Sequence, residues 1–173
     1  MQRIGSPAAL EELRKSIVAG KDPERPALAV CAAPSCHAFA KGRLVAAVEA
    51  ELAKRGLADK VELRKTGCLQ FCEQGPVVIV FPQQVCYLGV TAEDVPELVE
   101  KAFVEKAVLD RLLFTDPATG AKCVHKGDIP FFKDQTGLLI GNNALLDPKS
   151  LDDYLALGGY GALSKALFQM KPE

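Results

Sequence analysis

The sequence predicts an α/β fold, in which a mixed β-sheet is flanked by helices and followed by a mostly irregular C-terminal extension. Short apolar, β-branched runs alternate with helical patterns between residues 28 and 113. Two of these runs are separated by the turn Pro82-Gln83-Gln84, a spacing typical of a hairpin. After residue 113 the periodicity weakens and turn-forming residues accumulate. We therefore expect three parts: an N-terminal helix and linker at 1–26, an α/β domain at 27–113, and an extension at 114–173.

The N-terminal part is predicted to be an amphipathic helix over residues 6–19. Ser6 can cap it, and Pro7 suits the first helical position. Apolar residues at helical spacing, among them Leu10 and Ile17, fall on one face. The polar, proline-marked stretch KDPERP at 21–26 then reads as a linker.

The α/β domain is predicted to follow the order strand, helix, strand, strand, strand, helix. The expected elements are strands at 28–30, 61–66, 76–81 and 85–90, helices at 41–56 and 91–113, and a glycine-bounded loop at 67–75. A helix between the first two strands indicates a parallel crossover, and the last two strands form a hairpin. The result is a mixed sheet with helices packed on it, an arrangement found in thioredoxin-like folds.

The extension differs from the preceding domain in its composition. Residues 116–137 are rich in turn formers, which favours an extended connector or a docking arm. Ser150, with Asp153 three residues on, is expected to cap a short helix, and a second helix is expected from Tyr160. The glycines at 158, 159 and 161 are too few and wrongly spaced for a dinucleotide fingerprint, so we expect a turn between these helices.

Composition narrows the function classes. The chain has 21 Lys plus Arg against 22 Asp plus Glu, a balance that does not indicate a nucleic-acid partner. No apolar run is long enough to span a bilayer and the first residues lack a signal-peptide pattern, so we expect a cytoplasmic protein without membrane insertion. Cytosolic cysteines rarely form structural disulfides, and metal or cluster ligation is the leading explanation for the six present.

Four of these cysteines form two closely spaced pairs. Cys31 and Cys36 make C-x4-C at the end of the first strand, and Cys68 and Cys72 make C-x3-C in the loop after the next strand. Because the carboxyl ends of parallel strands lie side by side, the two pairs should meet at one edge of the sheet. A [2Fe-2S] cluster needs four thiolates, and these pairs supply them. We therefore predict Cys31, Cys36, Cys68 and Cys72 as cluster ligands, with no catalytic residue.

The surroundings of the pairs favour a bound cluster. Gly67 and Gly75 permit turns that bring backbone N–H groups toward sulfur, and the N-terminus of the helix at 41–56 is expected to point at the site. Apolar neighbours should exclude water, namely Ala32, Ala33, Leu69 and Phe71.

Two other chemistries remain open on the residues alone. A structural zinc site with four cysteines is one, although C-x4-C followed by C-x3-C is not its usual spacing. A thiol redox enzyme is the other, although the chain has no C-x-x-C. Of the remaining residues, Cys86 is predicted to fill core space and Cys123 to be partly exposed. His37 is predicted to face solvent near a helix start, and His125 to lie on the surface.

The second cysteine pair lies in a motif that resembles a known family. The stretch TGCLQFCEQGPVVIVFP at 66–82, preceded by C-x4-C at a distance of 31 residues, closely resembles the thioredoxin-like [2Fe-2S] ferredoxins. That family includes the ferredoxin-type subunit of the NADH-oxidising arm of complex I. The resemblance covers about residues 27–105. It implies electron transfer through a [2Fe-2S] cluster near the surface, held by the four cysteines named above.

The extension carries a second resemblance. Residues 129–167, IPFFKDQTGLLIGNNALLDPKSLDDYLALGGYGALSKAL, are similar to the start of the NADH-oxidising flavoprotein subunit of complex I, NAD-linked hydrogenases and formate dehydrogenases. The resemblance implies a module of such a complex, with flavoprotein and iron–sulfur subunits as partners and a homodimer as a further option. FMN and NAD(H) would lie on the flavoprotein part. The printed sequence stops where the flavin site of that family begins, so we do not expect this chain alone to oxidise NADH.

Overall fold

The structure, a computed structural model, describes residues 4–40 and 42–171 and divides into two compact units. One unit spans 24–147 and contains the main sheet. The other combines the described residues up to Pro23 with those from Pro148 onward. Within the described ranges, no helix has the length and apolar character that crossing a membrane requires.

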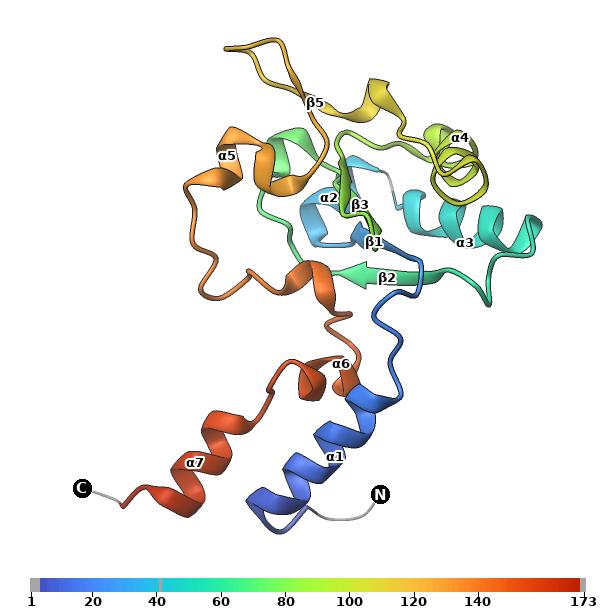
Figure 1. Cartoon of the computed structure of the whole chain (residues 1–173). Helices are drawn as coiled ribbons and strands as arrows, with labels where there is room; N and C mark the ends of the chain where they lie inside the picture. The colour runs from blue at the N-terminus through green and yellow to red at the C-terminus, as the bar shows by residue number, and fades with distance from the viewer. Residues whose placement is uncertain (1–3, 41, 172–173) are drawn as a thin grey trace. The chain divides into compact units, whose positions relative to one another are not determined.

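The main sheet has four strands in the order β2-β1-β3-β4 (Figure 1). Their bounds are Ala27–Cys31 for β1, Glu62–Thr66 for β2, Val78–Phe81 for β3 and Val85–Tyr87 for β4. β1 pairs with β2 in parallel and with β3 antiparallel, and β3 pairs with β4 as a hairpin. The predicted fold class, a mixed sheet with one parallel crossover and flanking helices, is confirmed.

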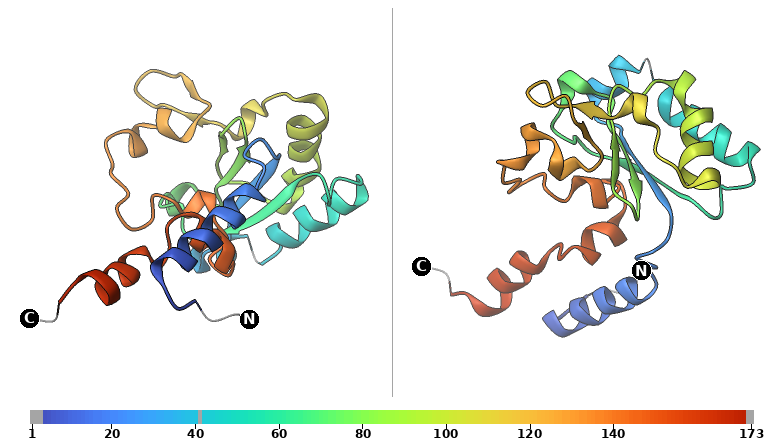
Figure 2. Two further views of the ribbon diagram at one scale, coloured as in Figure 1. Left: turned by 60° about the horizontal axis from the view of Figure 1, so that its bottom comes forward. Right: turned by 45° about the horizontal axis from the view of Figure 1, so that its top comes forward.

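The central strands are buried on both faces, and their side chains alternate between two cores. Leu28 and Val30 of β1 face a core that also contains residues of two flanking helices, such as Val48 and Leu98. Ala29 and Cys31 face the opposite core. Figures 1 and 2 show α3 (Leu44–Lys54) and α4 (Val95–Val99) on one side of the sheet and α5 (Pro130–Lys133) on the other. Both faces of the sheet must therefore be packed against other elements, because apolar side chains on either face would otherwise be exposed to water.

The first core is formed by helices that begin later and end earlier than predicted. The region expected as one helix at 41–56 contains α3, Leu44–Lys54, and a separate helix α2, Pro34–Phe39, precedes it. Pro34 occupies the first helical position of α2, which accounts for a short helix immediately after β1.

The helix expected over 91–113 is also shorter. A 3-10 turn η2 at Ala92–Asp94 leads into α4 at Val95–Val99 and a π-helical segment η3 at Glu100–Glu105. Thr91 and Asp94 form a capping box at the start of η2. Lys106 then takes a left-handed conformation, with a φ of 53°, and the chain leaves the helix. Leu109, Leu112 and Leu113 reach the core from the stretch that follows, which is not α-helical but includes the 3-10 turn η4 at Asp110–Leu112.

Residues 114–147 belong to the same unit as the sheet, which differs from the domain boundary expected at 113. Their elements are β5 Phe114–Thr115, β6 Lys122–Cys123, η5 Lys126–Asp128, α5 Pro130–Lys133 and η6 Asn143–Leu145. The Cys86 N–H donates to the Val124 carbonyl at 2.8 Å, so this segment covers the free edge of β4. Ile129 is fully buried in the second core. Apolar burial, rather than any regular periodicity, makes this segment part of the domain.

Within residues 4–23 and 148–171, the second unit contains three helices: α1 Pro7–Ala19, α6 Leu151–Ala156 and α7 Gly161–Gln169. The predicted caps are present, since the Ser6 hydroxyl accepts from Ala9 N–H and the Ser150 hydroxyl accepts from Asp153 N–H. Leu10 and Leu155 are its buried side chains among the described residues. The glycines at 158, 159 and 161 lie between α6 and the first turn of α7, as predicted.

Candidate metal centre

The two cysteine pairs come from neighbouring ends of the parallel strands. Cys31 is the last residue of β1 and stands opposite Thr66, the last residue of β2. Cys36 lies in α2, five residues beyond Cys31. Cys68 lies two residues beyond the end of β2, and Cys72 begins the 3-10 turn η1, Cys72–Gln74. The topology therefore brings both pairs to one edge of the sheet, as the parallel crossover requires.

Contacts between the two loops place the pairs together. The Cys31 thiol approaches the carbonyl oxygen of Gly67 at 3.6 Å, next to Cys68 in the chain. The Cys68 and Cys72 sulfurs are 3.9 Å apart. Cys31 and Cys36 are buried, whereas Cys68 and Cys72 are half-buried. One pair therefore lies beneath the surface and the other at it.

The electrostatics of the thiols link one pair to the other. The pKa of Cys36 is raised to about 12, chiefly by burial, and the hydrogen bond and charge of Cys31 and the charge of Cys72 act in the same direction. A hydrogen bond from Cys68 raises the pKa of Cys72, with burial and the charges of Cys68 and Cys31 acting in the same direction. Thiolates this close repel one another, so the arrangement favours a positive centre that would offset their charge.

The backbone of the second loop is shaped around sulfur. The Gln70 N–H donates to the Cys68 sulfur at 3.3 Å. To do so Gln70 takes a left-handed conformation with a φ of 77°, which is unusual for a residue other than glycine. At Gly75 a Cβ atom would lie 3.0 Å from the Cys36 sulfur and 3.3 Å from the Cys72 carbonyl oxygen. Gly75 therefore leaves the space in which the two loops meet.

Cys36 lies in a helix that was not predicted, and the helix expected to point at the site begins later than predicted. α3 begins at Leu44, and α2 lies between it and Cys31. Of the predicted apolar neighbours, Leu69 and Phe71 are buried, whereas Ala32 and Ala33 are half-buried. The predicted shielding is thus strongest on the side of the second loop.

The other singled-out residues lie elsewhere. Cys86 is fully buried in β4, as predicted for a core residue. Cys123, expected to be partly exposed, is buried with 8% of its surface accessible, because residues 122–132 pack against the sheet. His37 and His125 are exposed, as predicted. Among residues 4–40 and 42–171, no three His, Cys, Asp or Glu side chains are grouped so as to hold a single metal ion.

Sequence reasoning missed the residues of the extension that contact the second cysteine loop. Asn143 donates from its side-chain amide to the Cys68 carbonyl at 2.9 Å, and Phe131 stacks on Phe71. Both residues lie in the stretch 129–167 that resembles a flavoprotein subunit, but nothing local in the sequence connects position 143 with position 68. The GNN triplet at 141–143 is the one signal, because it marks a turn with an amide side chain.

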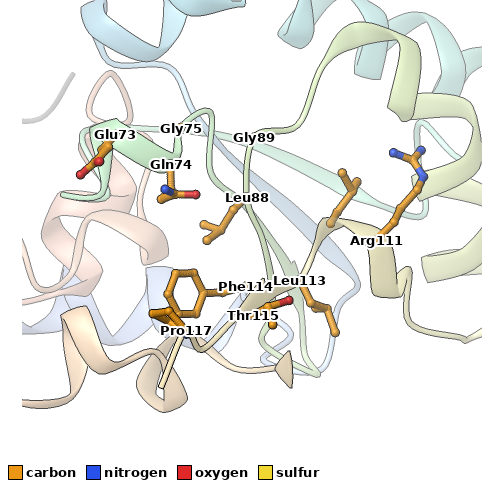
Figure 3. A pocket seen from close by; sticks show the side chains of 11 residues that line it. Glu73, Gln74, Gly75, Leu88, Gly89, Arg111, Leu113, Phe114, Thr115 and Pro117 are labelled. Atoms are coloured by element: carbon orange, nitrogen blue, oxygen red, sulfur yellow. The ribbon is translucent and has the colours of Figure 1, made fainter. Parts of the chain in front are cut away.

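A surface pocket of about 500 Å³ lies beside the same loop (Figure 3). Glu73, Gln74 and Gly75 line one side, and the stretch from Arg111 to Thr115 lines another. Arg111 is paired with Asp94 and Glu97, so its charge is already offset. The pocket thus borders the cysteine loop, and the positive charge that Arg111 brings to it is offset by Asp94 and Glu97.

Comparisons with known proteins show similarity to [2Fe-2S] ferredoxins. No family model matches the chain. A [2Fe-2S] ferredoxin from Clostridium pasteurianum is 39% identical over 77 residues, which are 44% of this chain and 76% of that protein. A [2Fe-2S] ferredoxin from Aquifex aeolicus is 44% identical over 50 residues, 29% of this chain and 45% of that one.

Two solved structures of a thioredoxin-like [2Fe-2S] ferredoxin from Aquifex aeolicus also resemble this chain. One, at 28% identity, has a TM-score of 0.49 and covers 54% of this chain and 99% of its own. The other, at 30% identity, has a TM-score of 0.48 and covers 51% and 89% respectively.

Proposed function

Because the chain belongs to the thioredoxin-like [2Fe-2S] ferredoxin family, we propose that it holds one [2Fe-2S] cluster and transfers single electrons through it. The observation that carries this proposal is the meeting of two thiol pairs at the ends of two parallel strands. Four thiolates are the ligand set of such a cluster. The proposed ligands are Cys31, Cys36, Cys68 and Cys72.

The residues present fit this group. The Cys68 and Cys72 sulfurs are 3.9 Å apart, and Cys31 is within hydrogen-bond reach of Cys36, so each pair suits one iron. Gly75 keeps the space beside Cys36 free of a side chain. When bound, the cluster supplies a centre that accepts and releases one electron at a time.

The protein's own part is to hold, shield and connect that centre. Leu69 and Phe71 are buried beside the ligands and exclude water from them. The Gln70 N–H donates to the Cys68 sulfur, and such bonds are among the features that set a cluster's reduction potential. Since Cys31 and Cys36 are buried while Cys68 and Cys72 are half-buried, electrons would enter and leave on the side of the second loop.

A wider role is part of the proposal. We infer that the chain serves as an electron-transfer module of an NAD(H)-linked oxidoreductase of several subunits, in the cytoplasm. The support is the likeness of residues 129–167 to the start of NADH-oxidising flavoproteins. FMN and NAD(H) would then bind to the flavoprotein, and the partners would be that protein and further iron–sulfur subunits.

Electron paramagnetic resonance tests the electron-transfer proposal. The chain is purified without oxygen, and spectra are recorded before and after reduction with dithionite. We expect a silent oxidised protein and a rhombic signal from the reduced cluster, amounting to about one spin per chain. A preparation that contains iron and sulfide yet gives no such signal after reduction would contradict the proposal.

A further inference from the structure

We propose that residues 129–143 form a clamp on the cluster loop, defined as residues 67–72, with Asn143 as the residue that positions the ligand Cys68. This inference rests on the proposed cluster. It goes further in giving the segment after the sheet a part in the properties of that cluster. The contacts that carry it come from both ends of the cluster loop, and all lie within the unit 24–147.

At the first end, Asn143 holds the backbone next to Cys68. Its side-chain amide donates to the Cys68 carbonyl at 2.9 Å. The same amide nitrogen lies 3.1 Å from the point at which Gly67 would carry a Cβ, so the absence of a side chain at Gly67 makes room for Asn143. The pair Gly67 and Asn143 is therefore matched in shape as well as in hydrogen bonding.

The bond from Asn143 reaches the sulfur through two peptide groups. The Cys68 carbonyl belongs to the peptide that leads into Leu69, and fixing it fixes the direction in which the chain continues. The next amide, that of Gln70, donates to the Cys68 sulfur from a left-handed conformation with a φ of 77°. A residue other than glycine adopts this conformation at a cost, and surrounding contacts must hold it there. Asn143 supplies one of those contacts.

At the second end, aromatic rings hold the residue before Cys72. Phe71 stacks on Phe131 with a centroid distance of 4.3 Å and an interplanar angle of 3°. Phe132 meets the Phe71 ring edge-on at 5.5 Å and 85°. Aromatic pairs of this kind stabilise beyond the area that they bury. Since Cys68 and Cys72 are the half-buried ligands, the clamp acts on the side of the cluster that water reaches first.

The clamp predicts different outcomes for two adjacent asparagines. Asn143→Ala removes the donor to Cys68, whereas Asn142→Ala changes an exposed neighbour and serves as the matched control. We expect Asn143→Ala to lose iron to a chelator about fivefold faster than the wild type. This factor corresponds to the free energy of about one lost hydrogen bond. Its reduction potential should fall as the Gln70 N–H moves away from sulfur. Asn142→Ala should match the wild type in both measurements.

A second pair of variants tests the aromatic end. Phe131→Ala should also speed iron release, while Phe168→Ala, in which an exposed phenylalanine of α7 is removed, should not. Thermal unfolding of the same preparations separates a local effect from a general one. If Asn143→Ala releases iron faster but unfolds at the wild-type temperature, the local clamp is supported.

The outcomes separate this inference from the proposed function. A wild type that holds iron and sulfide, with an Asn143→Ala variant equal to it in release rate and potential, would overturn the clamp and leave the cluster in place. If Asn143→Ala releases iron faster and also unfolds at a lower temperature than the wild type, the positioning role is overturned as well. A wild type without any iron–sulfur cluster would overturn both proposals.

Discussion

At the scale of single residues, the four thiols of the candidate site differ from the other two cysteines in what surrounds them. Cys36 is in electrostatic contact with Cys31 and Cys72, and Cys72 with Cys68. Burial raises the pKa of Cys86 to about 12, because its neighbours are apolar side chains of the sheet. The proposed ligands therefore differ from the core thiol in having other thiols beside them, and not in how deeply they are buried.

The first prediction uses that difference. Cys68→Ala, or Cys36→Ala, should abolish stable cluster assembly because one iron would keep a single thiolate. Cys86→Ala removes an equally sized side chain and should keep the cluster, at a cost in stability of about 1 kcal/mol for the small cavity. Iron and sulfide content and the visible spectrum of each purified variant provide the measurement. A full spectrum in Cys68→Ala would contradict the ligand assignment.

The second prediction concerns the space between the loops. Gly75→Ala should lower the cluster content, because the new methyl group would lie 3.0 Å from the Cys36 sulfur and 3.3 Å from the Cys72 carbonyl oxygen. Gly127→Ala is the control, since its Cβ would meet open space among the described residues. Iron per chain is measured after identical reconstitution of both. Equal iron in the two variants would show that the site tolerates the methyl group.

At the scale of elements, the local sequence pattern predicted most of the sheet. It failed to predict the end of the helix expected at 91–113, which tertiary packing determines. The β-branched runs gave the strands, and the glycine-bounded loop between β2 and β3 gave the position of Cys68 and Cys72. The helix expected to reach 113 ends at 105, although no Gly or Pro marks that point. Leu109, Leu112 and Leu113 fit an α-helical pattern in sequence, yet they fill the core from a stretch that is not α-helical. Burial outweighed propensity there.

An ion pair on α3 provides a prediction at this scale. Glu51 is nearly buried and accepts from the Arg55 Nε at 2.5 Å, while Arg55 also pairs with Glu100 of η3. The hydrogen bond from Arg55 lowers the pKa of Glu51 below its ordinary 4.5, with the charges of Lys54 and Arg55 adding to the effect. A lowered folded-state pKa means that the stabilisation is present above pH 4.5 and is lost as the pH falls through the folded value.

Glu51→Gln should therefore lower the free energy of unfolding at pH 7 by about 1 kcal/mol, and the difference from wild type should shrink as the pH falls below 4.5. Glu49→Gln on the same helix is the control. Its pair with Lys65 is half-exposed, and such pairs contribute less than about 1 kcal/mol. Urea unfolding over this pH range is the measurement. A Glu51→Gln difference that stays constant into acid would contradict the assignment.

At the scale of the whole molecule, the sequence did not show that residues 114–147 belong with the sheet. Their turn-rich composition resembles a connector, and the burial that places them in the unit 24–147 rests on scattered residues such as Cys123, Ile129 and Phe132. Scattered burial leaves no periodic pattern to read. For the same reason Asn143 could not be found, because its partner lies 75 residues away.

Amide hydrogen exchange tests this assignment. We expect slow exchange in β1 and β3, and measurable protection for the amides that pair within the segment, such as Phe132 N–H on Ile129. Residues around Leu138 and Leu139, with 91% and 96% of their surfaces accessible, should exchange fast. Uniformly fast exchange over 114–147 would mean that this stretch is a connector after all.

The most direct test of the central claim is the metal content of the wild-type chain. Iron, acid-labile sulfide and zinc are measured per chain after purification without oxygen, with protein concentration taken from amino-acid analysis. Four thiols that share a binuclear centre predict about two irons and two sulfides per chain, with negligible zinc. About one zinc per chain without iron or sulfide would contradict the claim, since a single tetrahedral ion would then be the occupant of the four cysteines.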